Sequence, residues 1–247
     1  MNTQTSVRAA TAVRLTEVTK KYRGGVTALD HVSLPVPRGT FLAVMGPSGS
    51  GKSTLLHCAA GLDVPTDGSV HIGDTEISGL SETKRTMLRR ERVGFVFQAY
   101  NLVPSLSVSD NITLPLRLAG ARPDHDWLRT LVAHIGLEGL LNRRPAELSG
   151  GQQQRAAVAR ALVARPDVVF ADEPTGALDL HTAGEVLDLL RRLADDFGQT
   201  VVMVTHDPGA AARAHEAVVM ADGRIRDVVA TPSAEKLAQL LTTLERR

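Results

Sequence analysis

Residues 46–54 constrain the fold more than any other stretch of the chain. They read Gly-Pro-Ser-Gly-Ser-Gly-Lys-Ser-Thr, where two glycines enclose four residues before a lysine and a hydroxyl residue, and they follow the apolar run 41–45. Glycine lets the main chain turn tightly enough to aim several N–H groups at one anion. The pattern therefore predicts a phosphate-binding loop between a strand and a helix. A dinucleotide fold spaces its glycines differently and has no use for the Lys-Ser pair.

Each residue of this loop is a candidate nucleotide-binding residue. The set is Gly46, Pro47, Ser48, Gly49, Ser50, Gly51, Lys52, Ser53 and Thr54. Lys52 is expected to reach the outer phosphates, and the Ser53 hydroxyl to coordinate magnesium. The helix that opens near Gly51 directs the positive end of its dipole at the anion. The loop is thus suited to a nucleoside triphosphate with Mg²⁺.

Length and charge limit the remaining possibilities. With 247 residues, the chain can form one large α/β domain or a core with a smaller subdomain. A net charge of +1 gives no general attraction to nucleic acid, and no nucleic-acid partner is expected. The single cysteine, Cys58, cannot form an internal disulfide. We expect it to serve as a small apolar side chain in a reducing compartment. The polar segment 1–11 lacks the pattern of a signal peptide, and no apolar run approaches about 18 residues. If the protein works at a membrane, we expect it to do so from the cytoplasmic side, on the inner face, through another chain.

Strand and helix patterns alternate along most of the sequence. Strands are predicted at 13–18, 28–36, 41–45, 93–97, 168–171 and 200–204, with a closing hairpin at 217–220 and 224–229 around Asp222-Gly223. Helices are predicted at 52–60, 81–91 and 181–197. This alternation predicts an α/β fold with a mostly parallel sheet covered on both faces.

Strand patterns are missing between residues 100 and 165, where prolines separate helical segments. We interpret about 99–165 as a helical subdomain inserted into a core that spans 12–230, with an N-terminal tail at 1–11 and a C-terminal helix at 231–247. The leucines of that last helix are expected to pack on their own domain. The exposed side of helix 81–91 is expected to carry Lys84, Arg85, Arg89 and Arg90, as either a solvated face or a binding surface.

Two further clusters carry candidate chemistry. Asp172 and Glu173 follow a buried strand, at the sheet edge where open α/β folds bind ligands. Asp172 is the candidate magnesium ligand, and Glu173 the candidate general base for attack of water on the terminal phosphate. Residues 148–152, Leu-Ser-Gly-Gly-Gln, begin another helix, and the N–H groups at its N-terminus form a second potential anion-binding site.

With this second motif the chain resembles the nucleotide-binding subunits of ATP-binding cassette (ABC) transporters, over about residues 13–229. The resemblance implies the ABC ATPase fold, with an antiparallel β subdomain beside the core. It also implies a homodimer around two MgATP, in which the signature of one copy closes over the nucleotide of the other. The signature residues are Leu148, Ser149, Gly150, Gly151 and Gln152.

Four more positions match the family one by one. Tyr22 corresponds to the aromatic residue that stacks on adenine. Gln98 corresponds to the glutamine that links the metal and the attacking water to the helical subdomain. Asp179 lies in the loop that crosses to the other subunit, and His206 corresponds to the histidine that contacts the terminal phosphate and holds Glu173.

Segments 97–116 and 171–176 resemble the macrolide-exporter and lipoprotein-release branch, although Ala177 stands where that branch often has Asn. This implies an ATPase that powers a separate membrane permease. The apolar residues Leu102, Val103, Leu106 and Val108 either pack on themselves or form a groove for a permease helix. The alternatives are a soluble cassette ATPase of DNA repair or translation, and a regulator of a cell-division or cell-wall permease-like partner.

Overall fold

The computed structural model describes residues 10–245. Most of the predicted tail at 1–11, and the last two residues of the predicted helix at 231–247, therefore lie outside the described residues. Within 10–245, no helix is both long enough and apolar enough to cross a membrane.

A six-stranded sheet forms the centre of the molecule, in the order β10-β9-β3-β8-β7-β6. Its strands are β3 (Phe41–Met45), β6 (Val93–Phe97), β7 (Val168–Asp172), β8 (Thr200–Val204), β9 (Glu216–Ala221) and β10 (Arg224–Ala230). Every pairing is parallel except that of β9 with β10, which the predicted hairpin joins. Asp222 and Gly223 both have positive φ, as a tight two-residue hairpin turn requires. The predicted mostly parallel α/β sheet is confirmed.

A second, antiparallel sheet packs beside it in the order β2-β1-β4-β5. Its strands are β1 (Thr11–Lys21), β2 (Thr27–Pro37), β4 (Asp67–Ile72) and β5 (Thr75–Glu76). Helix α1 (Lys52–Ala59) shares one core with this sheet and one face of the large sheet. Because strand side chains alternate, Leu42 and Val44 of β3 enter this core, while Phe41, Ala43 and Met45 face a second core on the helical side.

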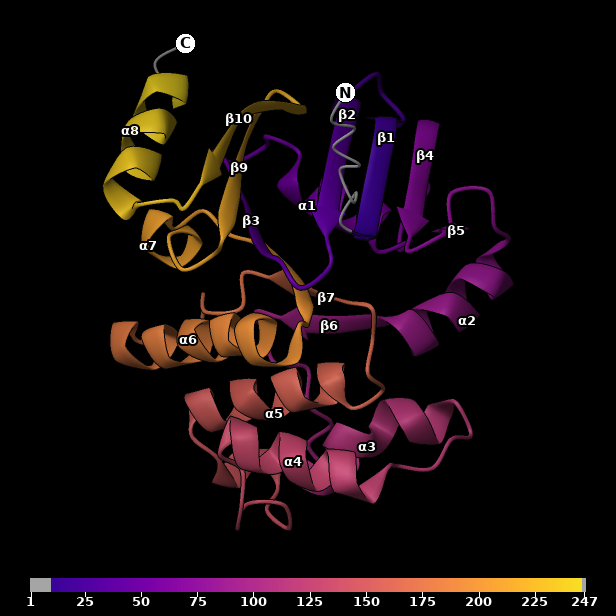
Figure 1. Cartoon of the computed structure of the whole chain (residues 1–247), viewed down its shortest axis with the longest axis vertical. Coiled ribbons are helices and arrows are strands. Elements are labelled where there is room, and N and C mark those ends of the chain that lie inside the picture. The colour runs from indigo at the N-terminus through magenta and orange to yellow at the C-terminus, as the bar shows by residue number, and fades with distance from the viewer. Residues whose placement is uncertain (1–9, 246–247) are drawn as a thin grey trace, which may run out of the picture.

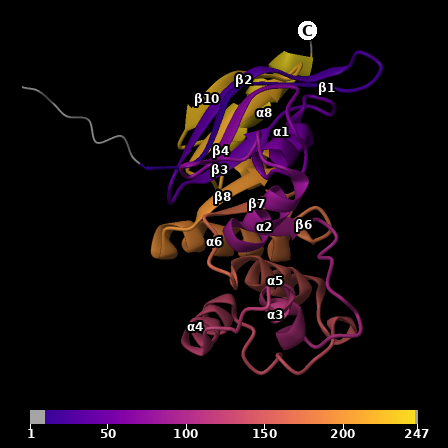
Figure 2. The ribbon, with the colours of Figure 1, turned by 90° about the vertical axis from the view of Figure 1, so that its right-hand side faces the viewer.

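Helices cover the other face and fill the lower half of Figures 1 and 2. They are α3 (Val108–Leu118), α4 (His125–Ile135), the 3-10 turn η1 (Pro145–Glu147), α5 (Gly150–Leu162) and α6 (Leu180–Phe197). Between β6 and β7 the described chain forms only helices and turns, as predicted. Helix α5 lies directly on β6, since a Cβ on Gly94 would stand 2.4 Å from the carbonyl oxygen of Ala161. The strand that leads to Gln98 is therefore in contact with the helix that begins at the signature.

Three further helices complete the fold, namely α2 (Glu82–Arg92), α7 (Pro208–Ala211) and α8 (Ala234–Glu245). Leu237 of α8 is fully buried, and the later leucines of that helix pack against the core, so the predicted packing of the C-terminal stripe on its own domain is confirmed. The prediction that Arg85 lies on an exposed face of α2 is wrong. Its side chain is buried against Gly61, and its guanidinium pairs with Glu82.

Candidate nucleotide site

The phosphate loop connects β3 to α1, as predicted, and two of its glycines are required by close contacts. Gly46 has φ 156° and Gly51 has φ 98°. A Cβ on Gly46 would stand 2.2 Å from the carbonyl oxygen of Met220, and one on Gly51 would stand 2.3 Å from that of Ala28. Neither neighbour can move cheaply, because both are backbone atoms. Glycine is therefore needed for the shape of the loop as well as for its flexibility.

Lys52, the first residue of α1, places its ammonium inside the curve of the loop. Its Nζ donates to the carbonyl oxygens of Gly46 and Pro47, at 2.8 Å each. Burial lowers the pKa of Lys52, whereas the nearby Glu173 and Asp172 carboxylates act to raise it. Together with Gly49, Gly51, Ser53, Thr54 and Ala28, Lys52 lines a cleft of about 180 Å³. This cleft is the place that the structure offers to phosphate groups.

Asp172 and Glu173 lie at the carboxyl end of β7, beside β8. The two residues that follow β8, Thr205 and His206, hold the Glu173 side chain. His206 Nδ1 is 2.8 Å from one Glu173 carboxylate oxygen, and the Thr205 hydroxyl donates to the other at 3.3 Å. The Glu173 backbone has φ 46°, a left-handed conformation that costs a residue other than glycine about 1–3 kcal/mol. Since such strain persists only where surrounding contacts enforce it, we interpret Glu173 as a side chain held in one orientation for chemistry.

Asp172 and Gln98 approach the same edge of the sheet. Burial raises the pKa of Asp172, with a further contribution from Glu173, while His57 and Lys52 act to lower it. The side-chain nitrogen of Gln98 lies 2.8 Å from the point where a Cβ on Gly176 would stand, so Gln98 rests on the turn that follows Glu173. The structure thus brings Lys52, Asp172, Glu173, His206 and Gln98 together around one end of the large sheet.

These donors fit magnesium. The Ser53 hydroxyl is exposed at the start of α1, and the Asp172 carboxylate lies close enough to Lys52 for the two charges to interact. Within residues 10–245, no cluster of three or more His, Cys, Asp or Glu could hold a metal ion by itself. Mg²⁺ in nucleotide sites is bound by oxygen ligands, with one or two protein carboxylates, and phosphate oxygens and water complete its shell. One hydroxyl, one carboxylate and one amide oxygen match that donor set.

The signature forms a capped helix start. The Ser149 hydroxyl accepts a hydrogen bond from the Gln152 N–H, and the Gln152 side chain accepts one from the Ser149 N–H, at 3.3 and 3.0 Å. Leu148 is buried and anchors the turn, while Ser149 is exposed. Both views of the ribbon place α5 in the half opposite to α1 (Figures 1 and 2). The structure therefore does not bring the signature to the phosphate loop of the same chain.

Asp179 caps helix α6. Its carboxylate accepts from the backbone N–H groups of His181 and Thr182 and from the Thr182 hydroxyl, and these bonds to Thr182 hold the pKa of Asp179 below its usual range. The next residue, Leu180, is 92% exposed, which is unusual for a leucine. Thr182 also packs so closely on Gly151 that a Cβ there would stand 2.3 Å from its methyl carbon. The Asp179 loop and the signature thus form one continuous surface.

Tyr22 is not among the residues that line the cleft at the phosphate loop. Its hydroxyl donates to Asp63 at 3.1 Å, and the Lys20 ammonium lies 5.1 Å from the centre of its ring. The side chain is 43% exposed. The structure therefore shows Tyr22 as a surface ring with one cationic neighbour, and stacking on adenine stays a prediction.

Sequence reasoning missed three side chains that support this site. Thr205 is buried and holds Glu173, as described above. Gln154 of α5 is fully buried, and its amide donates to the backbone oxygens of Pro174 and Phe97, which adjoin Glu173 and Gln98. Arg160 of α5 donates to the backbone oxygens of Tyr100 and Asn101. In the sequence, Thr205 looks like a residue at an ordinary strand end, and Gln154 and Arg160 look like residues of an ordinary helix. No sequence pattern therefore marks them as supports of the site.

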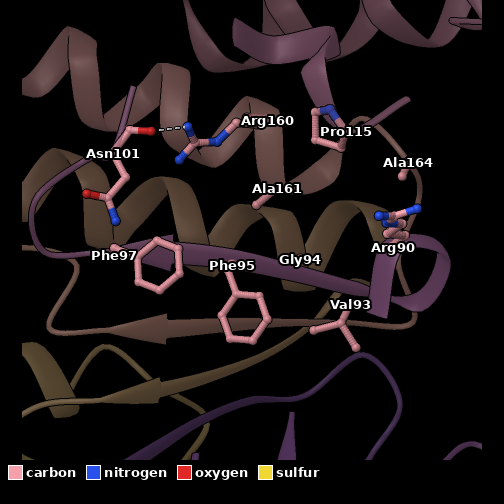
Figure 3. Close-up of a pocket in the computed structure, with 10 residues that line it drawn as sticks. All are labelled: Arg90, Val93, Gly94, Phe95, Phe97, Asn101, Pro115, Arg160, Ala161 and Ala164. Atoms are coloured by element: carbon pink, nitrogen blue, oxygen red, sulfur yellow. Dashed lines mark hydrogen bonds between the residues drawn. The ribbon is translucent and has the colours of Figure 1, made fainter. Parts of the chain in front are cut away.

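A groove opens beside these supports, between β6, α3 and α5 (Figure 3). Its volume is about 280 Å³, and the residues that line it include Arg90, Phe95, Phe97, Pro115, Arg160 and Ala164. The rings of Phe95 and Phe97 stack with their centres 5.5 Å apart and form the floor. The groove therefore combines an aromatic floor with two arginines, next to Gln98.

The fold, the phosphate loop and the acid pair define a P-loop ATPase of the cassette type. The sequence matches the family described as ABC transporter over residues 29–176, and the chain belongs to that family as an ATP-binding, ATP-hydrolysing subunit.

Two of its relatives are named for lipoprotein release and macrolide export. The lipoprotein-releasing system ATP-binding protein LolD of Bordetella avium is 46% identical over 230 residues, which cover 90% of this chain and 98% of the relative. The macrolide export ATP-binding/permease protein MacB of Bdellovibrio bacteriovorus is 41% identical over 228 residues, but these cover only 35% of that longer protein. The predicted resemblance to the macrolide-exporter and lipoprotein-release branch is confirmed.

Solved structures agree with the fold. Two dimeric structures of MJ0796, an ABC cassette of Methanocaldococcus jannaschii, each align with a TM-score of 0.78 at 39% identity, over 90% of this chain and 99% of theirs. One of them is described as a post-hydrolysis state bound to ADP and Pi.

Proposed function

We propose that two copies of the chain bind two MgATP head to tail, so that residues 148–152 of one copy close over the nucleotide in the phosphate loop of the other. One observation carries this proposal. The two helix N-termini that could bind phosphate, those of α1 and α5, lie in opposite halves of one chain (Figures 1 and 2). A site that needs both is incomplete in a single copy. The two MJ0796 structures, which are described as dimeric, support a dimer of the chain.

Each candidate site residue then has a defined task. The loop N–H groups and the Lys52 ammonium bind the phosphates, and Tyr22 stacks on the adenine. Glu173 accepts the proton of the water that attacks the terminal phosphate. His206 and Thr205 hold its carboxylate, and His206 also contacts that phosphate. Ser53, Asp172 and Gln98 would hold Mg²⁺, which neutralises the charge that develops on the phosphate oxygens.

The exposed loop at Asp179 meets the partner copy. Leu180, which is almost fully exposed in the single chain, supplies apolar contact there, and Thr182 joins this loop to the signature. Because both elements pack on each other within one chain, they would approach the nucleotide of the other copy as a unit.

The head-to-tail arrangement predicts complementation between two inactive variants. A Lys52→Ala chain keeps its signature, and a Ser149→Glu chain keeps its phosphate loop but presents a negative charge to the partner's nucleotide. Each alone is expected to lack ATPase activity. An equal mixture forms dimers with one intact site, and its activity is expected to reach up to about a quarter of the wild-type rate. ATPase measured across mixing ratios checks this. A mixture as inactive as its components would contradict a site shared between copies.

We further propose that the dimer powers a separate permease of the export, lipoprotein-release, peptide or drug class, and that this permease holds it at the inner face of the cell membrane. The names of LolD and MacB support this class of partner. A soluble ATPase of DNA repair or translation and a regulator of a cell-wall permease-like protein remain the alternatives.

The groove in Figure 3 is the proposed docking surface for the permease, and it differs from the surface that the sequence indicated. Val108 is fully buried and Leu102 packs against the core, so the self-packing alternative holds for both. The reason is Asn111, whose buried amide bonds to the backbone of Val103, Leu106 and Ser107 and folds this segment around itself. The aromatic floor at Phe95 and Phe97 is apolar surface that remains partly open in this groove.

Ala164 lines this groove, and a long charged side chain there would fill it. We expect Ala164→Arg to keep the basal ATPase of the isolated chain and to abolish its stimulation by the permease in reconstituted membranes. Ala119→Arg, on an exposed residue at the end of α3 outside the groove, is the matched control and should keep the stimulation. Full stimulation of a folded Ala164→Arg chain would remove the groove from the docking surface.

A further inference from the structure

The segment that follows Gln98 contains two strained residues in succession. Tyr100 has φ 48° and Asn101 has φ 52°, both in the left-handed region although neither is glycine. Asparagine tolerates this region better than most residues, but a bulky tyrosine does so rarely. Two consecutive residues of this kind keep their shape only where their surroundings enforce it. The backbone just beyond Gln98 therefore depends on an external support.

Arg160 supplies that support. Its two terminal guanidinium nitrogens donate to successive carbonyl oxygens, one to Tyr100 at 2.8 Å and the other to Asn101. Figure 3 shows the bond to Asn101. The planar fork of arginine suits two acceptors side by side, and a charged donor makes each bond stronger. Burial lowers the pKa of Arg160, and within residues 10–245 no carboxylate lies within ion-pair distance of it. The two backbone carbonyls are thus its hydrogen-bond partners in the described chain.

Helix α5 holds the same loop at two further points. The Tyr100 hydroxyl lies 3.0 Å from the point where a Cβ on the signature residue Gly150 would stand. Gln154 donates to the carbonyl oxygen of Phe97, immediately before Gln98. The loop of residues 97–101 is therefore fastened to the signature helix before and after Gln98, and Arg160 makes the strongest of these contacts.

We propose that Arg160 is a positioning residue for ATP hydrolysis: it clamps the strained pair Tyr100–Asn101, so that Gln98 faces the catalytic acids only while α5 is in its proper place. The clamp makes the position of Gln98 in one copy depend on the helix that carries the signature of that same copy. Movement of α5 when the dimer closes, or when a partner enters the adjoining groove, is passed to Gln98. This inference rests on the role proposed above for Gln98.

A purely structural arginine would behave differently. If Arg160 only stabilised the fold, its loss would lower the melting temperature, and the folded fraction would hydrolyse ATP normally. If it positions Gln98, its loss lowers kcat in protein that is folded and binds MgATP as before. The distinguishing quantity is kcat per folded molecule, measured with KM and with the melting temperature.

The first experiment removes the fork in the isolated full chain. Arg160→Met keeps the aliphatic stem, and we expect kcat to fall about 10- to 100-fold, the loss typical of a misplaced catalytic group, with little change in KM for MgATP. Arg160→Lys keeps the charge without the fork and is expected to lose most of the same rate. Arg155→Met, on the same helix and paired with Glu185, is the matched control with nearly wild-type kcat. Full activity of Arg160→Lys, or an equal loss in Arg155→Met, would overturn the proposal.

A double-mutant cycle then tests the route through Gln98. We expect Gln98→Ala combined with Arg160→Met, or with Arg160→Lys if the methionine variant does not fold, to be no slower than Gln98→Ala alone, within about twofold. Losses that multiply would mean that Arg160 acts elsewhere, which refutes this inference and leaves the proposed function intact. If Gln98→Ala itself retains full kcat, the role proposed for Gln98 fails first. The two failures are therefore distinguishable.

Discussion

Replacing Glu173 by glutamine is expected to leave MgATP binding intact and to slow turnover by about a hundred- to ten-thousandfold, the usual contribution of a positioned general base. The amide has nearly the shape of the carboxylate, and its oxygen can still accept a hydrogen bond from Thr205 or His206. It cannot accept a proton from water. The strained backbone at this position is retained, because it is fixed by the Glu173 N–H bond to the carbonyl oxygen of Val204.

Blocked hydrolysis should also trap the closed dimer. Size-exclusion chromatography with light scattering, at saturating ATP and high protein concentration, is expected to show Glu173→Gln as a dimer and the nucleotide-free protein as a monomer. Glu185→Gln, on α6 and away from the acid pair, is the matched control and should keep both turnover and the wild-type elution profile. A monomeric Glu173→Gln protein under these conditions would contradict the head-to-tail mechanism.

The parts of this molecule that the sequence predicts well are those whose cause is local. Strands β3, β6 and β8 begin and end where their apolar runs do. For β3 and β8 the reason is burial on both faces, which needs a continuous apolar run. The phosphate loop is equally local, because its glycines and lysine act within nine consecutive residues. For the same reason the Asp222-Gly223 hairpin could be placed from two residues alone.

The supports of the site could not be predicted in this way, because their partners are distant in the sequence. Arg160 meets Tyr100 and Asn101 across about sixty positions, and Gln154 meets Phe97 across 57. A half-buried arginine and a buried glutamine on one helix look like surface residues until the fold shows which carbonyls they satisfy. Val108 is a residue that the sequence left open between self-packing and docking surface. It follows a helix cap at Ser107, and only the fold shows that it is core.

Resemblance to the family supplied what local pattern could not, namely the roles of Gln98, Asp179 and His206. The structure places Gln98 and His206 beside the acid pair by independent contacts, to Gly176 and to Glu173. Asp179 is different, since its hydrogen bonds within the chain are those of an ordinary helix cap. Its role toward a second copy therefore stays a proposal, supported by the exposed Leu180 beside it.

Replacing Lys52 by alanine is expected to have the largest effect on binding, and to lower MgATP affinity by about ten- to a hundredfold. A hydrogen bond to a charged group contributes about 1.5–3 kcal/mol, and each 1.4 kcal/mol is a factor of ten in affinity. Lys52 is also the cation that faces Asp172 and Glu173. Without it, both carboxylates repel the phosphates with less opposition, and the carbonyl oxygens of Gly46 and Pro47 lose their donor.

Isothermal titration calorimetry of MgATP into the isolated chain measures this loss directly, because the expected defect is in binding and requires no turnover. Lys84→Ala, on the exposed side of α2, removes the same charge far from the loop and should bind as wild type does. The Lys52→Ala chain also loses two internal hydrogen bonds, those to Gly46 and Pro47. A melting curve without nucleotide therefore shows whether the variant still folds. Unchanged MgATP affinity in a folded Lys52→Ala chain would overturn the assignment of residues 46–54 as the phosphate site, because the ammonium that this loop encloses would then contribute nothing to holding the anion.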